Sequence, residues 1–79
     1  MSKTKVIPRG QFQYLRVSVA LEANGVTLDD VARSIDRGRS TVYKWFADDD
    51  HRRNPPRADD LASIAVLAGL STDACMGLD

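Results

Sequence analysis

The chain has 79 residues, enough for one small domain whose core is near the lower limit for independent stability. No apolar run approaches the ~20 residues that a membrane-spanning helix needs, and no apolar signal region follows the basic start, so we expect a cytoplasmic protein. The single cysteine, Cys75, cannot form an internal disulfide, and we interpret it as a small buried apolar side chain.

The formal net charge is zero, which argues against a strongly basic nucleic-acid-binding protein. The charges are nevertheless unevenly distributed. All eleven Lys and Arg lie between Lys3 and Arg57, a stretch with seven acidic residues and thus a net charge of +4, while the last 22 residues carry four Asp and no basic residue. A basic end opposite an acidic end suits a small protein that places one face on a phosphate backbone.

Residues 1–10 have no apolar periodicity and carry Lys3, Lys5, Pro8 and Arg9. We interpret them as a flexible basic arm that follows DNA, the alternative being an ordinary frayed terminus. Residues 11–79 then form a single domain.

The first helix is expected over Gln11 to Ala23, with Asn24 and Gly25 as its stop. Two apolar lines run along it. The first is made by Phe12, Leu15, Val19 and Ala23. The second is made by Tyr14, Val17 and Leu21, so much of this helix must be covered.

The stretch from Thr27 to Phe46 predicts two short helices either side of a break at residues 36–38. Thr27 is the candidate N-cap of the first helix, and acidic residues fill its first turn. Its apolar face has the spacing i, i+3, i+4 and i+7, provided by Leu28, Val31, Ala32 and Ile35. The second helix runs from about Arg39, with Val42, Trp45 and Phe46 as its apolar side. Two such helices joined by a tight bend containing Gly have the form of a helix-turn-helix.

This stretch resembles the helix-turn-helix family, and within it the phage repressor and Cro-like (XRE-type) branch. Ala32 matches the small residue at which the two helices meet, and R-S-T-V-Y-K-W is similar to a recognition helix. The matching branched core residues are Val31, Ile35 and Val42, with Trp45 in a further core position. The resemblance covers roughly Gln11 to Asp73 and implies an all-α fold, a compact bundle of four to five short helices like the lambda-repressor domain.

Two positions depart from the family pattern. Asp36 replaces the usual Gly of the turn, which is tolerable because Asp enters the left-handed region more easily than most residues. Leu28 replaces a Gln that commonly reaches a phosphate, so that contact is not carried over.

The resemblance implies that Arg39, Ser40 and Lys44 contact base edges. Their spacing supports this separately, because positions 1, 2 and 6 of a short helix point away from Val42 and Trp45. Arg matches guanine O6 and N7, and Lys shares that preference. Thr41 and Tyr43 flank them as further base contacts. The alternative is a solvated helix face that carries two cations.

Residues 47–57 form a loop. The expected phosphate contacts, in this loop and around the turn, are Thr27, Arg37, Gly38, Arg52, Arg53 and Arg57. The run Asp48 to Asp50 would repel phosphates, so it should point aside or serve another partner. His51 stands alone, which leaves no ligand set for a metal, and we expect no cofactor.

A later helix is expected from Ala58 to Ala68, ended by Gly69, with its core stripe at Leu61, Ile64, Ala65 and Ala68. It is apolar nearly all round, so it needs cover from a short helix beginning near Ser71 or Thr72 and from a second copy of the chain. The expected homodimer contacts are Val66, Leu67, Leu70, Met76 and Leu78.

The expected function is that of a sequence-specific double-stranded DNA-binding transcription regulator, a Cro-like phage repressor that occludes promoters as a dimer on a pseudo-palindromic operator. One alternative keeps the fold as a small protein–protein interaction module, such as a phage inhibitor of a host protein. Another is a DNA-binding recombination accessory factor. An enzyme is not expected, because no nucleophile set, metal cluster or phosphate loop is present in the sequence. No small-molecule ligand is expected either.

Overall fold

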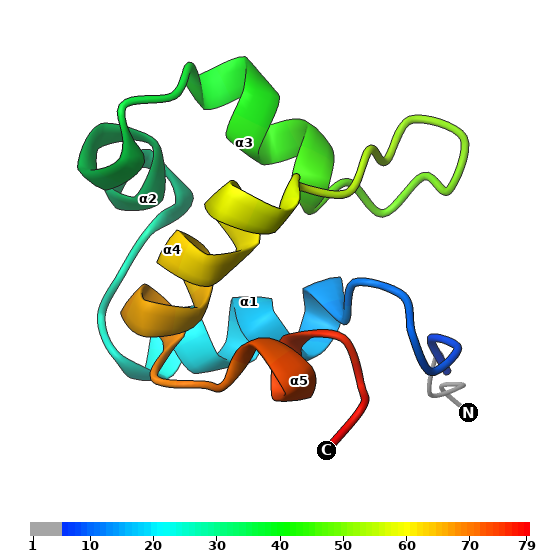
Figure 1. The fold of residues 1–79 in the computed structure, drawn as a ribbon. Helices are drawn as coiled ribbons and strands as arrows, with labels where there is room; N and C mark the ends of the chain where they lie inside the picture. Colours follow the sequence, from blue (N-terminus) through cyan, green and yellow to red (C-terminus); the bar gives the residue numbers. More distant parts are fainter. Residues whose placement is uncertain (1–5) are drawn as a thin grey trace.

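The computed structural model describes residues 6–79 and, within them, five α-helices and no strand (Figure 1). The helices are α1 (Tyr14–Ala23), α2 (Leu28–Ile35), α3 (Arg39–Trp45), α4 (Ala58–Ala68) and α5 (Thr72–Cys75). The expected all-α class and compact bundle of four to five short helices are thus confirmed, in a body of 36 × 25 × 23 Å. Within residues 6–79, no helix combines the length and the apolar character required to cross a lipid bilayer.

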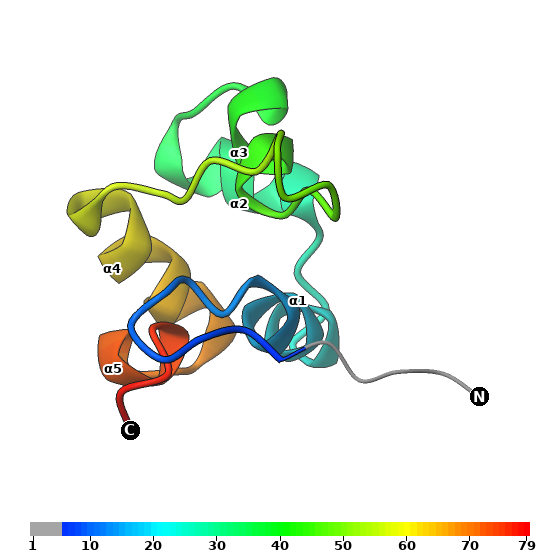
Figure 2. The same cartoon turned by 90° about the vertical axis from the view of Figure 1, so that its right-hand side faces the viewer.

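Helix α4 lies between two layers. The pair α2 and α3 covers one end of the molecule, and α1 and α5 form the other, where residues 6–12 also lie (Figures 1 and 2). Every helix contributes to one core, whose fully buried members include Val17, Val31, Val42, Ile64 and Cys75. Because each such side chain gains roughly 1.5–3 kcal/mol on leaving water, this shared core holds α3 in place.

Helix α2 begins at a complete capping box. The Thr27 hydroxyl accepts a hydrogen bond from the Asp30 N–H (3.1 Å), and the Asp30 carboxylate accepts one from the Thr27 N–H (3.0 Å). Hydrogen bonding of the Asp30 carboxyl to the backbone and then to the side chain of Thr27, followed by the charge of Arg33, lowers the pKa of Asp30. The helix ends at Asp36, which adopts the left-handed conformation (φ 58°) that the sequence requires at this turn.

Helix α1 corrects two expectations. It begins at Tyr14 and not at Gln11, and its buried face is the second apolar line, Tyr14, Val17 and Leu21. The first apolar line is not covered as expected: Leu15 is 37% exposed, Val19 is 67% exposed and Ala23 is exposed as well. Phe12 is buried, but it precedes the helix and so sets no helical phase. With two apolar lines on one helix, contact with α4 and α5 decides which faces inward.

The predicted arm of residues 1–10 is only partly described. Residues 7–10 lie against the body of the domain: the Gly10 N–H donates to the Met76 carbonyl (2.8 Å), and the Gln13 side chain donates to the carbonyls of Ile7 and Pro8. Ile7 packs against the core. Lys3 and Lys5, which carry the arm's predicted charge, lie outside the described residues.

The C-terminal segment folds back as expected. Ser71 caps α5 by accepting a hydrogen bond from the Ala74 N–H (3.0 Å), and Ala74 and Cys75 are buried. Burial raises the pKa of the Cys75 thiol, an effect that the nearby charge of Arg16 partly offsets. The interpretation of Cys75 as a small buried side chain is therefore confirmed.

Candidate nucleic-acid interface

Helix α3 is anchored by one side and exposed on the other. Val42 is fully buried and Trp45 is 4% exposed, which places both in the core as the sequence predicts. The residues predicted to contact bases are all exposed: Arg39, Ser40, Thr41, Tyr43 and Lys44. The outer face of α3 therefore presents two cations, two hydroxyl groups and a phenol to solvent.

Two of these side chains meet an acidic residue of α2. The Tyr43 hydroxyl donates to one carboxylate oxygen of Asp29 (2.8 Å), and an Arg39 guanidinium nitrogen lies 3.5 Å from the other. The hydrogen bond to Asp29 is the main reason why the pKa of Tyr43 is raised, with desolvation second. From the sequence, Asp29 is only an acidic residue in the first turn of α2, and its contacts with Arg39 and Tyr43 were not predicted.

A hollow of about 340 Å³ lies beside α3, toward the start of α4. Two predicted phosphate contacts, Arg37 and Arg57, line it together with Thr41 and Trp45. The structure thus brings together residues that are 20 positions apart in the chain. Arg37 and Arg57 place two positive charges along one flank of the exposed helix face.

Arg37 also holds the fold together. Its guanidinium donates to the carboxylate of Asp60 (3.0 Å) and lies 3.8 Å from that of Asp59. Asp60 is 8% exposed and is the one charged residue buried in the described part of the chain. Hydrogen bonding to Asp60 raises the pKa of Arg37, and this ion pair fixes the turn before α3 against α4.

A second hollow, of about 480 Å³, opens at the C-terminal end of α3. Tyr43 and Lys44 of α3 line it together with His51, Arg52 and Asn54 of the following loop. Arg52 is free to reach outward, because its side chain is 84% exposed and its nearest carboxylate, that of Asp49, lies 3.8 Å away. A second pair of cations, Lys44 and Arg52, therefore lies along this flank.

Arg53 is placed differently from its neighbour. Its guanidinium carbon lies 3.9 Å from the centre of the Tyr14 ring, and the same group donates to the Ala47 carbonyl (2.8 Å) and to the Asp50 carboxylate. The side chain is only 17% exposed. Arg53 fastens the loop to α1, so we leave it out of the interface despite the sequence prediction.

The acidic run Asp48 to Asp50 belongs to a loop that leaves the end of α3 and returns to α4 (Figure 1). Asp49 accepts a hydrogen bond from the His51 N–H (2.9 Å) and pairs with Arg52, while Asp50 pairs with Arg53. The run does not bury Arg39, Ser40 or Lys44, all of which remain exposed.

Thr27 and Gly38 lie at the starts of α2 and α3. The Thr27 hydroxyl is occupied by the capping box, and the Gly38 carbonyl accepts from the Val42 N–H (3.2 Å). Both residues are exposed, but neither lines the hollows beside α3.

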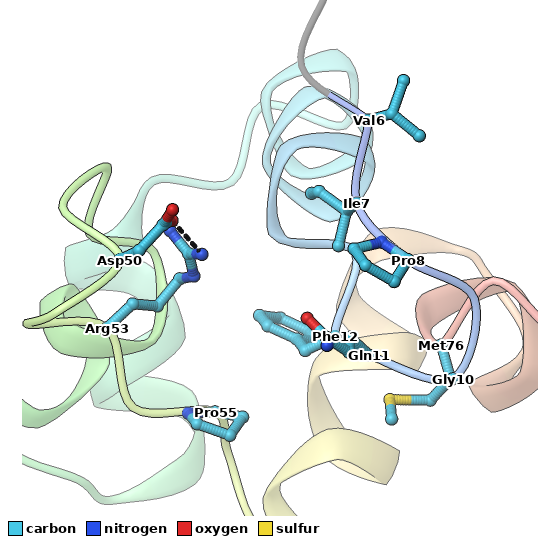
Figure 3. Close-up of a pocket in the computed structure, with 10 residues that line it drawn as sticks. All are labelled: Val6, Ile7, Pro8, Gly10, Gln11, Phe12, Asp50, Arg53, Pro55 and Met76. Carbon is cyan, nitrogen blue, oxygen red and sulfur yellow. Dashed lines mark hydrogen bonds and ion pairs between the residues drawn. The ribbon is translucent and has the colours of Figure 1, made fainter.

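A larger, half-open pocket of about 590 Å³ lies away from α3, between residues 6–12 and the loop before α4 (Figure 3). Its lining is apolar and polar in nearly equal parts, with the Arg53–Asp50 pair on the wall opposite residues 6–12. The apolar lining is Val6, Ile7, Pro8, Phe12, Pro55 and Met76. Residues 6–79 contain no cluster of His, Cys, Asp or Glu that could hold a metal ion.

The predicted dimer contacts do not share one hollow. Val66, which is 79% exposed, and Leu67 border a hollow between α2 and α4, whereas Met76 borders the pocket of Figure 3. Leu78 is 44% exposed and Leu70 is partly buried against the core. Val66 and Leu78 are the members most available to a second copy.

Comparison with known proteins gives no match, since no family model, no curated protein and no solved structure matches the chain.

Proposed function

We propose that this protein is a sequence-specific, double-stranded DNA-binding transcription regulator that inserts α3 into the major groove and acts as a Cro-like repressor. The observation that carries the proposal is the arrangement around α3. An exposed polar face lies between two hollows, one lined by Arg37 and Arg57 and the other by Lys44 and Arg52.

The dimensions of α3 suit this role. An α-helix is roughly 10–12 Å across with its side chains, and a B-DNA major groove is roughly 12 Å wide, so the seven-residue α3 can enter it. With the helix in the groove, we expect Arg57 in one hollow and Arg52 in the other to contact phosphates beside it. Contacts of this kind set the position of the protein but read no sequence.

Sequence would be read by the outer face of α3. Arg39 suits guanine, whose O6 and N7 accept two hydrogen bonds from a guanidinium group, and Lys44 shares this preference. Ser40 can donate to or accept from either base pair, and the methyl group of Thr41 suits a thymine methyl. Tyr43 is already hydrogen-bonded to Asp29, so it is better placed to support Arg39 than to read a base independently.

The zero net charge does not prevent binding, because charge near the helix matters more than the total. The cations beside α3 are exposed, while Asp59 and Asp60 are turned toward Arg37. Asp49 and Asp50 are likewise paired within their own loop. The exposed cations at α3 can therefore meet phosphates although the formal net charge of the chain is zero.

Repression would require two copies on one operator. Equivalent helices must then lie about 34 Å apart to enter successive major grooves. Two domains of 36 × 25 × 23 Å placed side by side can meet this spacing. Val66 and Leu78 are the exposed apolar residues that we assign to the contact. Sedimentation over a concentration series tests it: a monomer up to about millimolar concentration, on its own and on DNA, rules the dimer out.

Enrichment of bound duplexes from a random pool tests the whole proposal. We expect a short motif containing guanine, repeated as a pseudo-palindrome with half-sites about 10 base pairs apart. Enrichment of a single half-site would support sequence-specific binding but contradict binding as a dimer. A pool that shows no enrichment after repeated selection contradicts sequence-specific binding.

A protein-binding module is the second candidate, and the pocket of Figure 3 favours it. That pocket is large, is lined by both apolar side chains and the Arg53–Asp50 pair, and lies away from α3, as a site for a partner segment with apolar and charged side chains would. Substituting Met76→Asp would damage this function and leave DNA binding unchanged. Loss of DNA binding by exchange of Arg39 or Arg57, with the fold intact, favours the first candidate.

A further inference from the structure

We propose that Asp29 is a specificity-determining residue that holds Arg39 and Tyr43 of α3 in position and, with Arg39, selects a G·C base pair. This inference deepens the proposed DNA-binding function and rests on it. The fold places Asp29 where the first turn of α2 meets the outer face of α3.

Both carboxylate oxygens of Asp29 face α3. One accepts from the Tyr43 hydroxyl at 2.8 Å, and the other lies 3.5 Å from an Arg39 nitrogen. The short bond fixes the carboxylate, and the longer one leaves the guanidinium room to turn. Asp29 remains 42% exposed, and Arg39 is 69% exposed, so a duplex lying on α3 would meet both side chains.

Asp29 is not required to start α2. The capping box is completed by Thr27 and Asp30, whose side chains each accept a hydrogen bond from the backbone N–H of the other. The hydrogen bonds described for the Asp29 side chain go instead to α3. An acidic side chain near DNA repels phosphates, so one held at the reading face needs a reason beyond helix stability.

The chemistry of the pair matches G·C. A guanidinium group has five N–H donors, so Arg39 can keep its contact with Asp29 and still donate to guanine O6 and N7. A carboxylate only accepts, and the N4 amino group of the paired cytosine is a donor. Arg39 thus supplies the donors for guanine O6 and N7, and Asp29 supplies the acceptor for the cytosine N4 amino group. At an A·T pair, Arg39 would instead meet the N6 amino group of adenine.

Three variants test the proposal. Asp29→Asn removes the charge and keeps the shape, Tyr43→Phe removes only the hydroxyl that fixes Asp29, and Asp48→Asn is the matched control. Asp48 is an exposed acid in the loop after α3, so its loss changes the net charge equally. Each variant is titrated against the selected duplex and three others that differ at the base pair whose preference is lost in Arg39→Ala. Circular dichroism confirms the fold of each variant.

We expect the wild type to prefer G·C at this position by about tenfold or more, since a bidentate contact discriminates to that degree. Asp29→Asn should reduce this preference by about threefold or more while binding mixed duplexes as tightly or more tightly, because a repulsive charge is gone. Tyr43→Phe should shift the preference in the same direction by less. Asp48→Asn should leave the preference unchanged.

The results separate the two claims. If Asp29→Asn and Tyr43→Phe keep the wild-type preference, the role of Asp29 is overturned and DNA binding stands. A control that lowers the preference as much as Asp29→Asn also overturns it, because general charge would then explain the effect. If the wild type binds no duplex, the proposed function itself has failed.

Discussion

Arginines at the two ends of the domain are used differently, apart from Arg37 in the turn before α3, which is tightly paired with Asp60. At the α1–α5 end, Arg16 donates to the Ala74 carbonyl (2.9 Å) and to the carboxylate of Asp79 (3.0 Å), which closes the chain terminus onto α1. At the α3 end, Arg39 and Arg52 lie 3.5 and 3.8 Å from their nearest carboxylates. An arginine that is tightly paired within the fold stabilises it, whereas a loosely paired one remains available to an external anion.

The same contrast separates two adjacent residues. Arg53 is 17% exposed and stacks on Tyr14, while Arg52 is 84% exposed at the edge of the hollow beside Lys44. One sequence pattern, two arginines in a loop, therefore serves both purposes. The following predictions test whether stability and DNA binding divide along these lines.

The largest expected effect concerns the core beneath the α1–α5 end. Leu21 is 1% exposed, so Leu21→Ala should lower the free energy of unfolding by about 2–5 kcal/mol, since it leaves a cavity. Leu15→Ala on the same helix, at a site 37% exposed, should cost less than about 1 kcal/mol. Urea unfolding measures both. Equal losses would show that the assigned buried face of α1 is incorrect.

Arg53→Ala comes next. It removes the contact with Tyr14 and the bond to the Ala47 carbonyl, so we expect a loss of about 1–3 kcal/mol in unfolding free energy. Arg52→Ala should change stability by less than about 0.5 kcal/mol and weaken DNA binding for all sequences alike. Thermal unfolding and fluorescence anisotropy measure the two effects. An Arg53→Ala variant that keeps its stability but binds DNA less well would contradict the assignment of Arg53 to the fold.

Within the α3 end, reading and positioning should separate. Arg39→Ala should cost about 1–3 kcal/mol of binding free energy on the selected duplex and relax the preference at one base pair. Arg57→Ala should weaken binding to every duplex. It should also reduce the slope of log affinity against log salt concentration by about one. Competition titrations with single-base variants measure the difference. If both variants lose the base-pair preference equally, Arg39 and Arg57 cannot be divided into a base-reading and a phosphate-contacting residue.

The smallest effect is on acid stability at the α1–α5 end. The hydrogen bond from Arg16 lowers the pKa of Asp79 in the folded protein. A lowered folded pKa means that the pair stabilises the fold above the unfolded value, about 3.9, and that this contribution is lost as pH falls through the lower folded value. Asp79→Asn should therefore be less stable than the wild type at pH 6 and equal to it near pH 2. A difference that persists in acid would exclude this ionic cause.

Helix α2 and the turn after it were predictable because independent signals coincide there. Thr27 supplies a cap, the apolar spacing from Leu28 to Ile35 has one phase, and Asp36 permits a left-handed turn. The outward face of α3 followed from the burial of Val42 and Trp45, which the same pattern predicts. Local chemistry decides these features, so a sequence carries them.

Features that depend on tertiary packing could not be predicted from the sequence. Helix α1 has two apolar lines, and only its contacts with α4 and α5 select the one with Val17. Arg53 lies in the same loop as Arg52, and nothing local shows that its guanidinium reaches Tyr14 on α1. Asp29 is an ordinary first-turn acid until α3 brings Tyr43 against it. Each depends on residues that are distant in the chain.

The most direct test of the central claim is the affinity of the purified chain for a mixed-sequence duplex as a function of salt concentration. If the exposed cations beside α3 face phosphates, the chain binds at low salt, and the logarithm of the affinity falls linearly with that of salt, by roughly 0.9 for each phosphate contact. Arg57→Ala should reduce this slope by about one. No binding at about 50 mM salt, or binding that does not depend on salt, would contradict the account.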